Sequence, residues 1–181
     1  MSQKFSEINK VNNVYSPAVG SSGVAAAPGT ALYETDIVNL KLYKNCTFIA
    51  TIGATVAATL WNFKVMSCNS ATHTGITIPI AFNYQLQGST SAASYGAGSD
   101  TPEGLTAGTS DGINTTVAGY VGGTIIFEVD PAVVLAAGSG YEHVKLYWTA
   151  TTAADAPRAL SIVAILSEPR YPQAILNSAI D

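Results

Sequence analysis

The sequence predicts an all-β, single-domain protein, a β-sandwich or jelly roll with an extended arm at each end. From Leu32 onward, short runs of β-branched and aromatic residues are separated by Gly, Asn, Ser and Pro, as in strands joined by turns. About eight such runs follow one another, which suits a sandwich or jelly roll. The predicted organisation is an N-terminal arm (1–31), a β-sandwich domain (32–166) and a C-terminal extended segment (167–181).

The N-terminal arm is rich in Asn, Ser, Gly, Ala and Pro and has neither a helical nor a strand period. Without alternation it is not expected to join the core. Apolar residues nevertheless recur along it, which suits a segment that lies over a neighbouring surface. Its candidate partner contacts are Phe5, Ile8, Val14 and Tyr15.

The clearest strand is predicted over residues 76–86, where every second residue, beginning at Ile76, is large and apolar. Residues two apart share a face of a strand, so one face is expected to be buried and the other exposed. Phe82 is expected in the core. Pro79 cannot donate a ladder hydrogen bond, which predicts an edge position or a bulge.

The run at 143–150 predicts a strand almost as clearly as the run at 76–86. It turns one set of alternating residues inward, namely Val144, Leu146 and Trp148, and the other set outward, namely Lys145, Tyr147 and Thr149.

The run at 159–166 differs, because both of its faces are apolar. Leu160, Ile162 and Leu166 are expected to point inward, while Val163 and Ile165 occupy the opposite side. This strand is therefore predicted to be buried on both faces or covered by a partner.

Five further strands are predicted at 33–42, 47–52, 60–66, 113–117 and 124–129. A short connector helix is predicted after Asp130, which can cap it, with Pro131 favoured at the first position and Gly138 at the stop. Residues 88–112 form a long Gly-rich excursion, and loops of this length are usually functional or disordered.

Charged residues make up only 11% of the chain, against roughly a quarter in an average soluble protein. Such a neutral surface predicts contact area in an assembly, and a homotrimer is our expectation. Eight basic against twelve acidic residues, with no basic run, predict no nucleic-acid partner.

The first ten residues lack the apolar region of a signal peptide, and no apolar stretch approaches the ~20 residues of a membrane span. We expect synthesis in the cytoplasm and no membrane partner. In that reducing compartment Cys46 and Cys68 are predicted to be small buried hydrophobes rather than a disulfide.

The two histidines, His73 and His143, have no second metal ligand at a suitable spacing, so no metal and no cofactor are predicted. Glu142 could orient the imidazole of His143 for base catalysis. A solvated residue at the head of a strand is the favoured interpretation.

Two pairs of carboxylates share a face of their strands, Glu34 with Asp36 and Glu128 with Asp130. Such pairs could serve glycoside hydrolysis or bind calcium, but a structural role is favoured. The chain has no nucleophile elbow, no P-loop and no dinucleotide fingerprint. We therefore predict that it is not an enzyme and has no catalytic residues.

Aromatic residues divide into two groups. Trp61 and Trp148 fall in alternating strands, where core packing is favoured. Tyr95, Tyr120 and Tyr141 lie in Gly-rich loops and are candidate partner contacts, since tyrosine offers a large contact area with a polar tip. They could alternatively stack on a sugar.

Three segments carry a resemblance to a known class of protein: 13–17 (NVYSP), 29–36 (GTALYETD) and 163–171 (VAILSEPRY). In style, nearly the whole chain is similar to small structural proteins of tailed bacteriophages, the capsid decoration or cement proteins. The resemblance implies a β-rich, trimeric virion protein that clamps neighbouring subunits of the capsid. Tyr171, in the C-terminal segment, is a further candidate contact.

The resulting hypothesis is a non-enzymatic virion protein, made in the host cytoplasm, that binds the major capsid protein or another virion protein and stabilises the lattice. Three alternatives remain open: another virion component (capsid shell, tail or head fibre), a carbohydrate-binding module and, more remotely, a small β-barrel enzyme.

Overall fold

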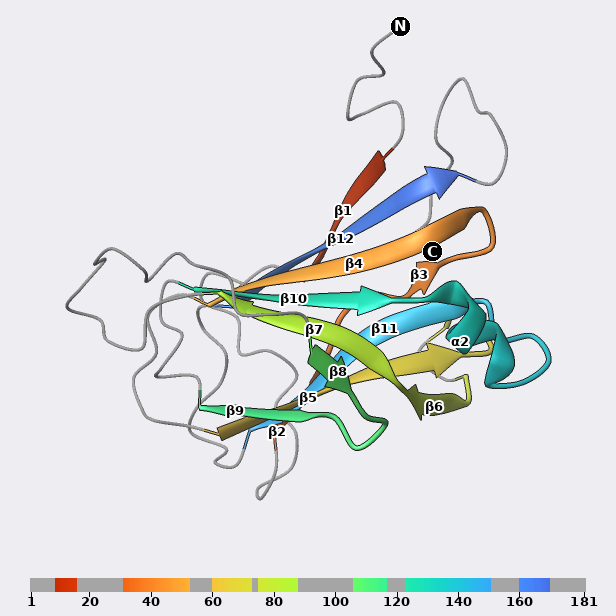
Figure 1. The fold of residues 1–181 in the computed structure, drawn as a ribbon. Helices are drawn as coiled ribbons and strands as arrows, with labels where there is room; N and C mark the ends of the chain where they lie inside the picture. The colour runs from red at the N-terminus through yellow and green to blue at the C-terminus, as the bar shows by residue number, and fades with distance from the viewer. Residues whose placement is uncertain are drawn as a thin grey trace, which may run out of the picture.

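The computed structural model describes residues 9–15, 31–52, 60–72, 75–87, 106–116, 123–150 and 160–169. These residues form twelve strands and one helix, and the strands build two antiparallel sheets that pack face to face (Figure 1). The predicted all-β sandwich is confirmed.

Each sheet has six strands. Sheet A has the order β1 (Asn9–Tyr15), β12 (Leu160–Pro169), β4 (Tyr43–Ile52), β10 (Thr124–Val129), β7 (Phe82–Gln87) and β8 (Thr106–Gly108). Sheet B has the order β2 (Ala31–Glu34), β11 (His143–Ala150), β5 (Leu60–Cys68) and β6 (Thr77–Ile80), with β3 (Val38–Asn39) beside β11 and β9 (Ile113–Thr116) beside β5. Helix α2 (Pro131–Ala136) lies at one end of the sandwich (Figure 1).

The core lies between the sheets. The inward residues predicted for β11 and β12 are all fully buried, as are both free cysteines: Val144, Leu146, Trp148, Leu160, Ile162, Leu166, Cys46 and Cys68. Trp148 is the centre of an aromatic cluster. Its ring stacks on Tyr33 at 5.7 Å and on Phe63 at 6.1 Å between centroids, which links three strands of sheet B.

The predicted strand at 76–86 is in fact two strands in different sheets. β6 pairs with β5 in sheet B, whereas β7 pairs with β10 in sheet A. Ile80 and Phe82 flank the crossing between the layers and both lie in the core. Pro79 is on an edge strand, as predicted. Ile76 was expected on the buried face, but it precedes β6 and is exposed.

The predicted strand at 33–42 is interrupted by Thr35. The Thr35 hydroxyl accepts the N–H of Leu146 at 3.1 Å, while the Thr35 N–H donates to the Leu146 carbonyl at 2.9 Å. The Thr35 hydroxyl thus takes the place that a backbone carbonyl would have in the strand ladder. Because the ladder is interrupted at this residue, β2 ends before β3 begins.

Part of the predicted N-terminal arm is a strand of the sandwich. β1 pairs antiparallel with β12 from Asn9 to Tyr15. Val14 is 3% exposed, and the Tyr15 ring meets Trp148 edge-on at 4.9 Å. The expectation that residues 1–31 stay outside the fold is therefore wrong for 9–15; residues 1–8 and 16–30 lie outside the described residues.

The physical reason is Asn12, which occupies an inward position opposite Ala164 and is buried. A polar residue there removes the apolar alternation that would have identified the strand. The C-terminal boundary also shifts, because β12 continues to Pro169 rather than ending at Leu166.

Helix α2 forms as predicted. The Asp130 carboxylate accepts the N–H of Ala132 at 2.8 Å, Pro131 begins the helix, and Gly138 follows its end with a φ of +154°. Val134, on the inner side of the helix, is buried, and its backbone carbonyl accepts a hydrogen bond from the Ser67 hydroxyl at 3.3 Å.

Candidate functional site

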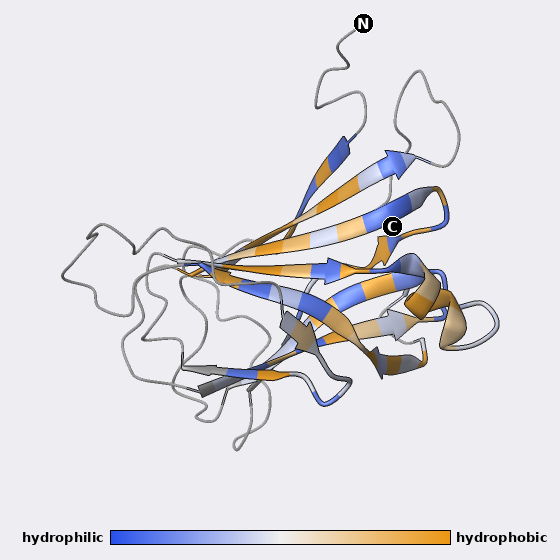
Figure 2. Ribbon diagram, in the orientation of Figure 1, coloured by the Kyte–Doolittle hydropathy of each residue, from blue (hydrophilic) through white to orange (hydrophobic). Residues whose placement is uncertain are grey.

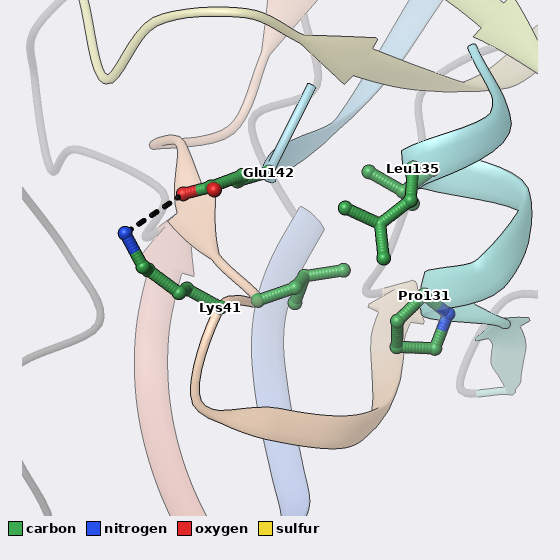
Figure 3. Close-up of a pocket in the computed structure, with 6 residues that line it drawn as sticks. Lys41, Pro131, Leu135 and Glu142 are labelled. Atoms are coloured by element: carbon green, nitrogen blue, oxygen red, sulfur yellow. Dashed lines mark ion pairs between the residues drawn. The ribbon is translucent and has the colours of Figure 1, made fainter. Parts of the chain in front are cut away.

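A small cavity lies between α2 and the turn before β4. It has a volume of about 60 Å³ and is lined by Leu40, Lys41, Pro131, Val134, Leu135 and Glu142. Figure 3 shows the Lys41 ammonium and the Glu142 carboxylate facing each other at its edge, with 3.6 Å between Nζ and Oε2. Ligand sites usually measure roughly 300–1,000 Å³, so this cavity holds no more than a few waters.

An open hollow of about 420 Å³ lies beside it, lined by Lys44, Asp130, Pro131, Ala132 and Leu135. Leu135 lines both the cavity and the hollow, and it is 47% exposed. A single exposed leucine among charged residues is ordinary for a protein surface and does not define a ligand site.

Two of the four candidate acids, and the histidine of the described residues, are held in structural contacts; Asp36 and Glu128 are exposed. Asp130 caps α2. Glu34 forms an ion pair with Lys145, and the ring Nε2 of His143 lies 3.1 Å from the amide of Asn39. His143 is half-buried rather than solvated. His73 lies outside the described residues.

Lys145 corrects another prediction. It was expected to point into solvent with Tyr147 and Thr149, yet it is buried and its Nζ lies 2.5 Å from the Glu34 carboxylate. Its charge also acts on Cys68: burial raises the pKa of that thiol to about 11, Lys145 lowers it and Glu34 raises it further.

Within the described ranges, no three His, Cys, Asp or Glu residues lie together as a metal site would require. In the same part of the chain, no helix has the length and apolar character needed to cross a bilayer.

The surface of sheet A that faces away from the core carries an apolar patch. We call this surface the outer A face; its apolar centre comprises Val11, Ile49, Ile126, Val163 and Ile165. Val11 is 52% exposed and the other four are partly exposed. Hydrophobic segments recur on the neighbouring strands β12, β4 and β10 (Figure 2).

The strand register places these five residues side by side. Val11 is opposite Ile165, and Val163 is opposite Ile49, which is in turn opposite Ile126. Directly opposed residues in a sheet have Cβ atoms about 4.5–5.5 Å apart on one face. The patch therefore crosses four strands without a break.

Uncharged polar residues surround the apolar centre. Opposite and beside it on the same face lie Asn13, Asn45, Thr47, Thr51, Asn83, Gln85, Thr124, Ser161 and Ser167. Glu128 is the one ionisable residue at a paired position of this face in the described strands. An apolar centre with a polar rim and almost no charge is typical of a surface that contacts another protein.

The predicted partner contacts are placed differently. Val14 and Tyr141, 3% and 7% exposed, are buried within the chain, which leaves them little surface to offer to a partner. Tyr15 packs on Trp148. Phe5, Ile8, Tyr95, Tyr120 and Tyr171 lie outside the described residues.

The sequence signalled one part of the outer A face. The two-sided apolar pattern of β12 predicted that Val163 and Ile165 are buried on a second face or covered by a partner, and in the single chain both are partly exposed. Ile49 and Ile126 were missed as surface residues, because a short apolar run does not reveal which of its faces meets the core.

Comparison with protein-family models gave no match, and comparison with curated proteins gave none either. Among solved structures, one titled "Structure of infectious bursal disease virus Gt strain" is 12% identical with a TM-score of 0.22, over 93% of this chain and 38% of that chain. This chain thus spans well under half the length of that protein. A similarity this weak carries no information on function.

Proposed function

We propose that this protein is a non-enzymatic structural component of a virus particle, a decoration or cement protein that stabilises the capsid lattice. The observation that carries the proposal is the outer A face, an apolar and almost uncharged surface of the sandwich. The resemblance of segments such as 163–171 to phage capsid-associated proteins supports the viral setting.

The strength of such a contact can be judged from its area. Five strands about 4.8 Å apart and seven residues of about 3.3 Å each span roughly 550 Å². A standard interface buries about 800 Å² per partner. One contact of this size is weak by itself, so a lattice that presents many symmetric copies is the setting in which it becomes effective.

The contacts of the acidic residues also support a structural role. Asp130 and Glu34 each have a fold-stabilising partner, in the cap of α2 and in the ion pair with Lys145. Tyr141, one of the tyrosines considered for sugar stacking, is buried and contributes no platform.

The test is co-sedimentation with purified particles of the virus that encodes the chain. We expect the protein to sediment with particles at a fixed number of copies per particle, and to be released without loss of the capsid shell. Removal that dissolves the shell would identify a shell subunit, and a few copies per particle would identify a tail or fibre component. Absence from particles would overturn the proposal.

A further inference from the structure

We propose that the outer A face pairs face to face with the same face of a second copy of this chain. The pairing goes beyond the proposed function, because it assigns the outer A face to a contact between two copies; attachment of the pair to a particle would then fall to other surfaces. It states what covers this face, whose five central aliphatic residues are partly or largely exposed in the single chain.

The first argument is area. The face measures roughly 550 Å², so two copies bury about 1,100 Å² together. A specific interface needs about 1,000 Å² with good complementarity. Two such sheets suffice for a reversible dimer, and neither copy needs a further surface.

The second argument is charge. The chain carries a net charge of −4, so two copies repel each other over most orientations. On the outer A face the paired positions hold one carboxylate, Glu128, on strand β10, away from Val163 at the centre. Face-to-face pairing therefore brings the fewest like charges together. A partner of opposite charge would find almost nothing to complement there.

The third argument is shape. Val and Ile have restricted rotamers and project from a pleated sheet as low ridges. Stacked sheets lie about 10 Å apart, with strand directions about 30° apart, so that such side chains interdigitate. Val163 has Ile49 beside it on β4 and Asn13 beside it on β1. It sits in the middle of the patch, close to the expected two-fold axis.

The pairing has a consequence for symmetry. A surface that binds itself is isologous and closes after two copies, so the assembly contains an even number of chains. This differs from the homotrimer that the composition suggested. A pair also contains every attachment surface of the chain twice, which would raise the avidity for a repeating lattice.

A cysteine at the centre of the patch tests the pairing directly. Cys46 and Cys68 are the only cysteines of the chain and both are buried, so Val163→Cys introduces its one accessible thiol. Mild oxidation with copper–phenanthroline removes two electrons and two protons from a pair of thiols. It is expected to yield a covalent dimer, because a disulfide requires the two Cα atoms to approach within about 7 Å, and a residue beside the two-fold axis is the one that lies nearest its own copy. Ser139→Cys, in the exposed turn after α2, is the matched control and should remain monomeric on a denaturing gel.

Sedimentation velocity gives the reversible measurement. At about 100 µM the unmodified full-length chain should have the mass of a dimer. Val163→Glu should weaken the dimer at least tenfold, because a carboxylate would be buried without a partner at the axis. Ser139→Glu adds the same charge elsewhere and should leave the dimer intact. Circular dichroism checks the fold, and Val163→Thr, nearly isosteric, replaces Val163→Glu if the latter unfolds.

A monomer at every concentration, an odd number of chains, or an association that Val163→Glu and Val163→Thr leave unchanged would overturn the inference. If the chain is monomeric and Val163→Glu abolishes binding to particles, the face contacts the particle; the pairing then fails and the proposed function stands. If the chain pairs as described but is absent from particles, the pairing stands and the proposed function fails.

Discussion

Lys145 and Glu34 form an ion pair across the neighbouring strands β11 and β2, although they are 111 positions apart in the sequence. The Lys145 side chain is 5% exposed and that of Glu34 is 32% exposed. The ammonium is thus almost completely removed from water, and the carboxylate, which keeps some contact with solvent, is its ionic partner.

Glu34→Ala should destabilise the protein, because it leaves a buried ammonium without its carboxylate. We expect a loss of about 1–3 kcal/mol in the free energy of unfolding, measured by chemical denaturation. Glu142→Ala is the control: it breaks the Lys41–Glu142 pair, whose lysine is 65% exposed and keeps its water without the carboxylate, and should cost less than about 1 kcal/mol. Equal losses in the two variants would contradict the assignment of the buried pair.

Gly108→Ala should also be destabilising. A Cβ at this position would lie 2.6 Å from the ring of Phe82, its partner across β7 and β8. Phe82 packs against Phe127 at 5.8 Å in the core, so its ring has little room to move. Overpacking of this kind costs about 1–3 kcal/mol. Ala107→Ser, at the exposed neighbouring position, should unfold like the wild type; a tolerated Gly108→Ala would mean that β8 does not pack on Phe82.

Tyr15→Ala tests whether β1 belongs to the sandwich. It removes the edge-on contact with Trp148 and should lower the free energy of unfolding by about 1–3 kcal/mol. Asn13→Ala, on the outward side of the same strand, should change it by less than about 0.5 kcal/mol. If thermal unfolding is the same for both variants, residues 9–15 do not contribute to the stability of the sandwich.

The free energy of unfolding should fall as the pH rises above 9. In the unfolded chain a thiol ionises near its ordinary pKa of 9.0, whereas burial raises the pKa of Cys68 to about 11 and that of Cys46 further. Between pH 9 and 11 the unfolded state therefore holds fewer protons than the folded state. Stability that is fully present below pH 9 is lost as the pH rises, by up to about 1.4 kcal/mol per pH unit for each thiol.

Urea denaturation at pH 8, 9 and 10 measures this slope. The double variant Cys46→Ala and Cys68→Ala should show a smaller decrease over the same interval, although it starts from a lower stability because two buried side chains are shortened. An identical slope in the wild type and the double variant would show that the thiols are not the cause.

The alternating pattern predicted strands well where a single strand stays in a single sheet. In β11, Val144, Leu146 and Trp148 point inward as expected. The same pattern was misleading at 76–86, because a chain that bends between two layers keeps its inward alternation through Ile80 and Phe82. Periodicity reports which side of the chain is buried, and says nothing of which strand is its neighbour.

The same limit of the sequence pattern applies to the outer A face. The apolar pattern of β12 predicted that Val163 and Ile165 are buried on a second face or covered by a partner, yet it could not show that Ile49 and Ile126 lie beside them. The residues chosen for exposure to a partner were less reliable. Tyr141 was selected because it sits in a loop with glycines, and the loop folds its ring into the chain.

The sequence by itself determined the features that depend on neighbouring residues: the all-β class, the cap of α2 by Asp130, and the burial of two unpaired cysteines. These follow from local preferences and from side chains that favour the interior. Only the tertiary structure decided that Asn12 would enter the core side of a sheet, that Lys145 would meet Glu34, and that aliphatic residues of four strands would form one outward patch. Those outcomes depend on the pairing of strands distant in the sequence, which is set by the fit of the whole core rather than by any single segment.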